Sequence, residues 1–244
     1  MADFRTHITT SAIVGTVYGA AGYVNWGLPI PTCMLAAGLC GVAGMLPDVD
    51  SESGVPLRET MAFGAAVIPM LMLERFQHLG LSHESMVLAG GCIYIVIRFG
   101  LGELMRRCTV HRGMWPSIPA AALAGTTATL ICSCSDTRLR MFKATAVVIG
   151  YLTHLLLDEL YAVEWYRGRL RFKNTFGTAF KLFSRSLLPN FVTYGLLFLA
   201  AATTWYDPMW TIPDRPNPRT FQQVAHDLLD GWLTMPAEQG RRRR

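Results

Sequence analysis

The sequence predicts an all-α membrane protein, a polytopic helical bundle with about six to seven apolar helices. Hydrophobic residues make up 51% of the chain and charged residues only 16%, and the mean hydropathy is positive. Apolar runs long enough to approach the thickness of a bilayer recur along the chain, separated by short polar or proline-containing connections. This composition is typical of an integral membrane protein.

The first four apolar runs each fit a membrane helix. Residues 8–24 are rich in Gly, Ala, Ser and Thr, which let helices approach closely in lipid. Residues 32–46 are short for a full crossing. The run at 60–73 contains Pro69 and is also borderline in length, whereas residues 85–101 give a stronger span.

Three more runs are expected at residues 117–133, in a sixth span that includes 144–157, and at 187–206. The last one ends in Trp205, which suits an aromatic anchor at the membrane surface. Between the last two runs, residues 164–186 alternate basic and apolar positions. That alternation indicates an interfacial hairpin or amphipathic segment, and a solvated loop is the alternative interpretation.

We expect a membrane-embedded domain at 1–206, followed at 207–244 by a Pro-rich linker, a short amphipathic helix near 219–233 and a basic disordered tail. Arg241–Arg244 contribute four units of the net charge of +5. A basic balance of this kind favours anionic lipid headgroups as partners, and no nucleic acid is expected. The six cysteines show no CxxC pair and are interpreted as reduced thiols.

The sixth span carries the most informative pair of polar residues. His154 and Asp158 are four residues apart inside an apolar run, so a helix places them on one face, about 6 Å apart. Ionisable groups at membrane depth are costly and mark ion sites, substrate sites or polar contacts between helices. Either the two residues bind a metal ion, or they form a buried hydrogen bond that stabilises the packing of helices.

Other polar residues are expected to meet this pair. If every run crosses the membrane, the segment with His7, the loop at 47–59 and the loop at 102–116 all lie on the same side as the end of the sixth span. Arginines concentrate on that side, so the positive-inside rule makes it cytoplasmic. His78 and His83 lie outside this set and are interpreted as surface histidines.

The converging residues are those of a metal centre. Imidazole and carboxylate groups suit zinc, with manganese or iron as alternatives, and such an ion activates water for hydrolysis. The candidate metal ligands are His7, Asp48, Asp50, His111, His154 and Asp158, and the catalytic candidates are Arg112 and Asp50. Arg112 is expected to stabilise anionic oxygens of a phosphate or carboxylate on the substrate.

Each motif alone also has a structural interpretation. The PDVD sequence is an ordinary turn former, His111 and Arg112 would fit a basic patch beside the membrane, and His7 would simply line the first helix. No GxSxG, Walker or GxGxxG motif supports a serine hydrolase, an NTPase or a dehydrogenase.

The motifs also carry a resemblance. TH at 6–7, LPDVD at 46–50, VHRGMWPSIPAA at 110–121 and GYLTHLLLDE at 150–159 together resemble the YdjM-type family of membrane-bound, predicted metal-dependent hydrolases, over roughly residues 5–185. That family's pattern is similar to the all-helical superfamily of zinc-dependent phospholipase C and single-strand nucleases. The resemblance implies metal roles for the six candidate ligands and a phosphodiester substrate.

The sequence departs from the family pattern at one position. The family's HRGxxHS motif has a second histidine before the serine, where this chain has Pro116 before Ser117. Proline cannot bind a metal, so a ligand is missing or is replaced, with Glu159 and Glu164 as the candidates nearby in sequence.

We therefore expect a multi-pass protein of the cell's inner membrane whose site faces the cytoplasm. Its expected function is hydrolysis of a phosphoester, in one interpretation a lipid, by metal-activated water. The first alternative is a non-enzymatic membrane protein with a structural or degenerate metal site, and the second is a transporter. The hydrolase requires the side chains of His154, Asp158, Asp48 and His111 to lie within about 8 Å of a common point.

Overall fold

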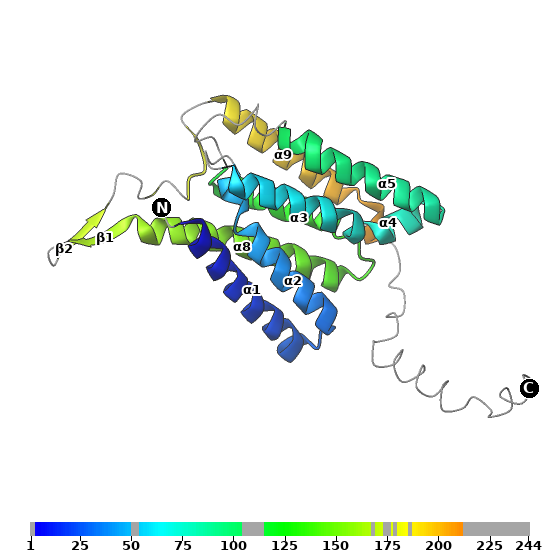
Figure 1. Ribbon diagram of the computed structural model, residues 1–244, viewed down its shortest axis with the longest axis horizontal. Helices are drawn as coiled ribbons and strands as arrows, with labels where there is room; N and C mark the ends of the chain where they lie inside the picture. Colours follow the sequence, from blue (N-terminus) through cyan, green and yellow to red (C-terminus); the bar gives the residue numbers. More distant parts are fainter. Residues whose placement is uncertain are drawn as a thin grey trace, which may run out of the picture. The chain divides into compact units, whose positions relative to one another are not determined.

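The computed structural model describes residues 3–49, 54–103, 115–166, 169–172, 177, 180–184 and 187–211. All of them belong to one compact unit, Met1–Ile212 (Figure 1). Asp50, His111, Arg112 and the expected amphipathic helix near 219–233 lie outside the described residues.

The described chain is helical apart from one short hairpin. In order, its helices are α1 (Phe4–Trp26), α2 (Ile30–Ala43), the 3-10 turn η1 (Leu46–Asp48), α3 (Val55–Leu71), α4 (Leu73–His78), α5 (His83–Ile95), the π-helical turn η2 (Val96–Leu101), α7 (Ile118–Ile131), α8 (Thr137–Tyr161), α9 (Leu187–Trp205) and η3 (Pro208–Trp210). Between α8 and α9, the antiparallel strands β1 (Val163–Tyr166) and β2 (Arg169–Phe172) form the hairpin.

Five helical segments are long and apolar enough to cross a membrane. They are Ile30–Asp48, Pro56–His78, His83–Leu101, Thr137–Tyr161 and Leu187–Trp205, and Ile118–Ile131 is a shorter apolar helix. The 23-residue α1, rich in small residues, packs beside them. The predicted fold class, a helical membrane bundle, is confirmed.

The third span is longer than the apolar run at 60–73 predicted. Gly54 precedes α3 in a left-handed conformation, with φ of 62°, and Pro56 occupies the first turn of the helix. Arg58 and Glu59 in that turn are exposed and pair with each other. Because this polar turn is helical, the candidate span reaches from Pro56 to His78.

Two helices expose apolar side chains along their whole length. Neither α5 nor α9 has a buried residue. Leu88 of α5 is 71% exposed, and Phe191 and Phe198 of α9 are 80% and 77% exposed. A helix that is apolar all round and unburied is stable only in a nonpolar solvent, so these surfaces face lipid.

Helices α1, α2 and α8 pack with almost no space between their backbones. A Cβ atom added to Gly15 of α1 would lie 2.5 Å from the carbonyl oxygen of Ala37, and one added to Gly150 of α8 would lie 2.0 Å from that of Cys40. The small residues thus allow the close approach that the sequence predicts. This packing fixes how far apart side chains on α1 and α8 lie.

Contacts between distant residues divide the polar groups between two ends of the bundle. His7 and Asp48 meet residues of the last turns of α8, whereas Arg75 and Asp207 meet the first turn of α8 through Arg140. Because His154 and Arg140 are 14 residues apart on one helix, the ends are separated by about 21 Å.

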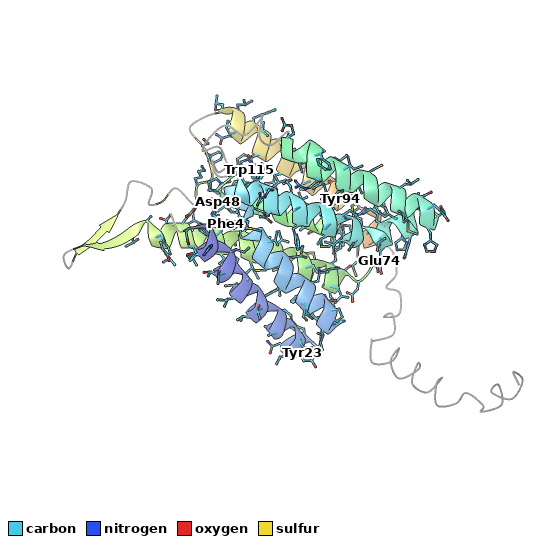
Figure 2. The ribbon with its side chains drawn as sticks, in the orientation of Figure 1. Phe4, Tyr23, Asp48, Glu74, Tyr94 and Trp115 are labelled. Atoms are coloured by element: carbon cyan, nitrogen blue, oxygen red, sulfur yellow. The ribbon has the colours of Figure 1, made fainter. Side chains whose placement is uncertain are left out.

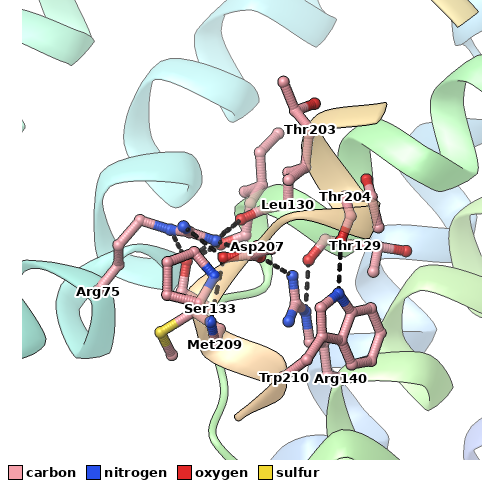
Figure 3. Close-up of polar contacts among 12 residues, drawn as sticks. Arg75, Thr129, Leu130, Ser133, Arg140, Thr203, Thr204, Asp207, Met209 and Trp210 are labelled. Carbon is pink, nitrogen blue, oxygen red and sulfur yellow. Dashed lines mark hydrogen bonds and ion pairs between the residues drawn. The ribbon is translucent and has the colours of Figure 1, made fainter. Parts of the chain in front are cut away.

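At the second end, one carboxylate ties three helices together (Figure 3). Asp207, which follows α9, accepts two hydrogen bonds of 2.9 Å from the guanidinium of Arg75 and one from Arg140. The same arginines donate to the carbonyl oxygens of Leu130 and Thr129 in the last turn of α7. The carboxyl end of a helix carries a partial negative charge. It therefore balances part of the second positive charge of the two arginines, which a single carboxylate leaves uncompensated.

The cysteines within the described residues are free thiols, as expected. They are Cys33, Cys40, Cys92, Cys132 and Cys134. Cys108 lies outside the described residues.

Candidate metal centre

His7 lies in the second turn of α1 and points into the bundle. Asp3 caps the helix, and its side chain accepts a hydrogen bond of 3.0 Å from the backbone N–H of Thr6. From His7 onward the buried residues of α1 are small and recur every three or four positions: Ser11, Gly15, Gly19 and Gly22. His7 is therefore the one large polar side chain on the face that α1 buries, and only 1% of it is exposed.

His154 and Asp158 occupy the same face of α8, as their spacing predicts. The Nε2 atom of His154 lies 3.5 Å from a carboxylate oxygen of Asp158, and the two side chains are 1% and 9% exposed. Gly150, one turn earlier, brings this face of α8 against α2. The pair therefore lies inside the protein and is shielded from lipid.

A backbone carbonyl fixes the orientation of the His154 ring. The Nδ1 atom lies 2.6 Å from the carbonyl oxygen of Gly44, just after α2. Because a carbonyl oxygen only accepts, Nδ1 must carry the proton and donate. In the neutral ring this leaves the lone pair on Nε2, which is the arrangement found in metal-binding histidines.

The three side chains converge on one small volume. His7 Nε2 lies 3.5 Å from Asp158 Oδ1, and the imidazole rings of His7 and His154 stack with their centroids 3.7 Å apart. One ligand atom from each of the three residues lies within 4.8 Å of the other two. Donors around a tetrahedral ion with bonds of about 2.1 Å are about 3.4 Å apart, so the 3.5 Å separations of the two imidazoles from the Asp158 carboxylate fit a shared ion.

Two buried atoms of the cluster lack hydrogen-bond partners, His154 Nε2 and Asp158 Oδ1. They lie 3.5 Å from Asp158 Oδ2 and from His7 Nε2, respectively, which is too long for good hydrogen bonds. Buried polar groups are normally satisfied. A cation bound between them would satisfy both atoms, so the residues present fit a metal ion better than they fit a plain hydrogen-bonded contact.

Asp48 lies at the edge of this cluster. Its Oδ1 atom is 3.5 Å from His154 Nε2, and its side chain is 33% exposed. Pro47 is the middle residue of the η1 turn, which follows α2 and ends at Asp48. In Figure 2, Asp48, Phe4 and Trp115 lie at one end of the helices, while Glu74 and Tyr23 lie at the other. Asp48 therefore marks the solvent-facing side of the cluster.

The structure thus brings together His7, Asp48, His154 and Asp158 of the six predicted ligands. Asp50, His111 and Arg112 fall outside the described residues. One contact bears on the loop that contains the last two: the hydroxyl of Tyr151, one turn before His154, donates to the carbonyl oxygen of Trp115. That bond holds the end of the loop close to α8.

The structure describes the surroundings of Pro116 and of Glu159, one of the two residues considered as substitutes for the missing histidine. Pro116 directly precedes Ser117, whose side chain caps α7 by accepting from the N–H of Ala120 at 3.3 Å. The Oε1 atom of Glu159 accepts a hydrogen bond of 2.5 Å from the N–H of Gly177. The Oε2 atom of Glu159 is buried and has no hydrogen-bond partner. The strand register pairs position 164 with position 171.

Two contributors to the centre were not predicted from the sequence, Gly44 and Ser11. A Cβ atom on Gly44 would lie 2.1 Å from the Oγ of Ser11, so only glycine allows α1 to pack against this turn. Gly44 then presents its carbonyl oxygen to His154. The glycine two residues before the LPDVD motif is the only sequence signal for this role.

His78 and His83 do not join the centre. His83 is exposed and His78 is partly buried, and both lie near the opposite end of the bundle. The interpretation of His83 as a surface residue therefore agrees with the structure, and it provides a histidine outside the cluster for comparison.

Comparisons with known proteins place the chain in a family. A family model described as YdjM inner membrane protein matches residues 1–167, which include α1 through α8 and the cluster just described. Comparisons with curated proteins and with solved structures find no match. Since the family match spans more than half of the 244 residues, the chain belongs to the YdjM inner membrane protein family.

Proposed function

We propose that this inner membrane protein is a metal-dependent hydrolase whose substrate is a phosphoester. The observation that carries the proposal is the buried group of His7, His154 and Asp158, whose ligand atoms lie within 4.8 Å of one another. Within it, His154 Nε2 and Asp158 Oδ1 lack hydrogen-bond partners. A divalent ion held there, with zinc as the best fit, supplies Lewis-acid chemistry that activates water for attack.

The donor set favours catalysis over a purely structural role. Structural zinc sites are closed by four protein ligands, most of them cysteines, whereas catalytic sites use three nitrogen or oxygen ligands and keep one position open. Two imidazoles and one carboxylate match the catalytic type. Asp48 borders the cluster on its solvent-facing side, where it serves as a further ligand beside the open position.

The remaining predicted residues have assigned roles in this proposal. Arg112 binds the anionic oxygens of the substrate through its guanidinium, while Asp50 and His111 add donors at the open side. Arg112 is three residues from Trp115, whose carbonyl is bound by Tyr151. Three extended residues span at most about 11 Å, so the loop has the reach to bring Arg112 to the cluster.

We place the centre at the cytoplasmic surface of the inner membrane and propose a phospholipid-derived phosphoester as the substrate class. In the sequence, the segment between η2 and α7 contains Arg106, Arg107 and Arg112, and the connection between β1 and β2 contains Arg167, a distribution that the positive-inside rule associates with the cytoplasm. Leu156 and Leu160 on α8, the helix that carries His154 and Asp158, are 51% and 58% exposed, so the helix that holds the centre also has an apolar outer face for lipid.

The test combines metal analysis with an activity assay on detergent-purified protein. In the wild type we expect close to one or two zinc ions per chain and hydrolysis of a chromogenic phosphodiester. Asp158→Asn removes the charge but keeps the shape, so metal content and activity should both fall while the protein remains folded. The matched control is Glu59→Gln, an exposed carboxylate near the same end, which should leave both unchanged.

The alternatives predict different results. A structural metal site predicts bound metal without activity in the wild type and loss of folding in Asp158→Asn. A transporter predicts metal flux into proteoliposomes and no hydrolysis. Wild-type protein free of metal after purification in zinc-containing buffer would contradict all metal-dependent forms of the proposal.

A further inference from the structure

The two faces of the β1–β2 hairpin differ in polarity. Its register pairs Val163 with Phe172, Glu164 with Arg171, Trp165 with Leu170 and Tyr166 with Arg169. Residues opposite each other in an antiparallel pair lie on the same face, and successive residues alternate between faces. One face therefore collects only apolar residues, Val163, Trp165, Leu170 and Phe172, and the other collects Glu164, Tyr166, Arg169 and Arg171.

The apolar face of such a hairpin must be shielded from water for the hairpin to be stable. Two strands alone are at best marginally stable in water. Among the described elements, the main neighbour of the hairpin is α8, the helix from which it continues. In Figure 1 the strands extend from the end of α8.

The end of α8 shows which medium surrounds the hairpin. Leu152, Leu156 and Leu160 recur every four residues and are 36%, 51% and 58% exposed, so one face of α8 meets lipid up to its last turn. The helix ends at Tyr161 and β1 starts at Val163. The hairpin therefore directly follows the end of a lipid-facing helix.

We propose that the β1–β2 hairpin lies flat in the headgroup layer of the membrane and binds anionic phospholipids. Its apolar face enters the acyl-chain boundary, and Arg169 and Arg171 on the opposite face bind headgroup phosphates. Arginine is the side chain best suited to phosphate oxygens, and basic residues near an anionic leaflet are attracted to it. Trp165 is a residue type that favours this interface.

The hairpin begins five residues after Asp158, so it anchors the membrane end at which the cluster lies. The inference does not depend on hydrolysis, because it rests on the register of the strands and on the lipid-facing surface of α8 alone. An inactive or metal-free protein would bind lipid through the hairpin equally well.

The test is photo-crosslinking of the full chain in lipid nanodiscs. The photoreactive amino acid p-benzoylphenylalanine replaces Trp165 in one variant and Tyr166 in the other. Both substitutions replace one aromatic residue by another. The nanodiscs contain phosphatidylcholine and phosphatidylglycerol, and adducts are identified by mass spectrometry. We expect lipid adducts several-fold more abundant at position 165, which lies on the apolar face, than at 166.

A second arm tests the role of charge. Arg169→Gln combined with Arg171→Gln should lower the share of phosphatidylglycerol among the adducts at position 165 toward its share in the nanodisc. Equal lipid adducts at 165 and 166, adducts to protein instead of lipid at 165, or an unchanged phosphatidylglycerol share in the double variant would each overturn the proposal.

Discussion

The ring of His154 is held through its Nδ1 atom, which donates to the carbonyl oxygen of Gly44 at 2.6 Å. The bond joins α8 to the turn after α2, two segments 110 residues apart in the chain. It determines both the tautomer and the direction of Nε2, which lies 3.5 Å from Asp158 and from Asp48. Histidines that bind metals typically have such an acceptor behind them.

Replacing His154 by Asn should separate folding from metal binding. The amide nitrogen of Asn can occupy the place of Nδ1 and donate to Gly44, but nothing replaces Nε2. Mutating a residue that only hydrogen-bonds to a metal ligand typically lowers metal affinity by about 10 to 100-fold. Loss of the ligand itself should therefore lower the affinity by at least about 100-fold. We expect the metal-free variant to unfold at nearly the wild-type temperature in a thiol-reactive fluorescence assay.

His154→Ala supplies the comparison, because it also leaves the Gly44 carbonyl unpaired and creates a cavity. That variant should unfold at a lower temperature than His154→Asn. His83→Gln, at an exposed histidine away from the cluster, should change neither property. Wild-type metal affinity in His154→Asn would show that Nε2 is not a ligand.

A second prediction concerns the contact between α2 and α8. In Gly150→Ala, the new methyl group would lie 2.0 Å from the carbonyl oxygen of Cys40, so α8 must move away from α2. Overpacking of this kind costs about 1 to 3 kcal/mol. Since His154 follows one turn later, we expect lower thermal stability together with weaker zinc binding, measured by competition with a fluorescent chelator.

Gly38→Ala is the matched control, since a Cβ atom on Gly38 of α2 meets nothing within 4 Å. It should keep wild-type zinc affinity, and its stability should be equal or slightly higher because Ala favours the helix. If both substitutions had the same effect, the close packing at Gly150 would not be what positions His154.

Several parts of this architecture follow from the sequence alone. The four-residue spacing of His154 and Asp158 fixes a shared helix face, and the small residues of α1 permit close helix packing. The alternation of basic and apolar residues after position 164 leaves a hairpin, an amphipathic segment and a solvated loop as alternatives, and the structure has the hairpin. These are local patterns, in which the residues that interact are near one another in the chain or share one element.

Other parts depend on contacts that no local pattern records. A backbone carbonyl such as that of Gly44 has no side chain by which to recognise its role. The bond between Arg75 and Asp207 joins residues 132 positions apart, and a composition-based view assigns Asp207 to a linker. Only the tertiary packing shows that Asp207 belongs to the helical bundle.

A third prediction follows from that bond. Asp207→Ala would leave the guanidinium of Arg140, which is fully buried, without its carboxylate partner. Removing one member of a buried ion pair costs about 3 to 5 kcal/mol, so we expect a large drop in unfolding temperature. Glu59→Gln removes a carboxylate from an exposed pair, which should cost at most about 1 kcal/mol. Equal effects of the two would contradict a structural role for Asp207.

The same carboxylate predicts a dependence of stability on pH. Burial raises the pKa of Asp207, but hydrogen bonds donated by Arg75 and Arg140 outweigh that effect, so the pKa lies below the ordinary value of 3.8. A carboxyl group whose pKa is lowered by folding contributes its stabilisation fully above the ordinary pKa. That contribution is lost as the pH falls through the folded-state value.

Unfolding temperatures of the wild type and Asp207→Asn should therefore differ most above about pH 5 and converge as the pH falls below the ordinary carboxyl pKa. The variant has no carboxylate at this position to protonate, so subtracting its profile removes the contribution of every other acid. A difference that stayed constant or grew on acidification would show that the charge of Asp207 does not stabilise the fold. Since the cluster around His154 lies about 21 Å away along α8, the same comparison at saturating zinc should give the same convergence.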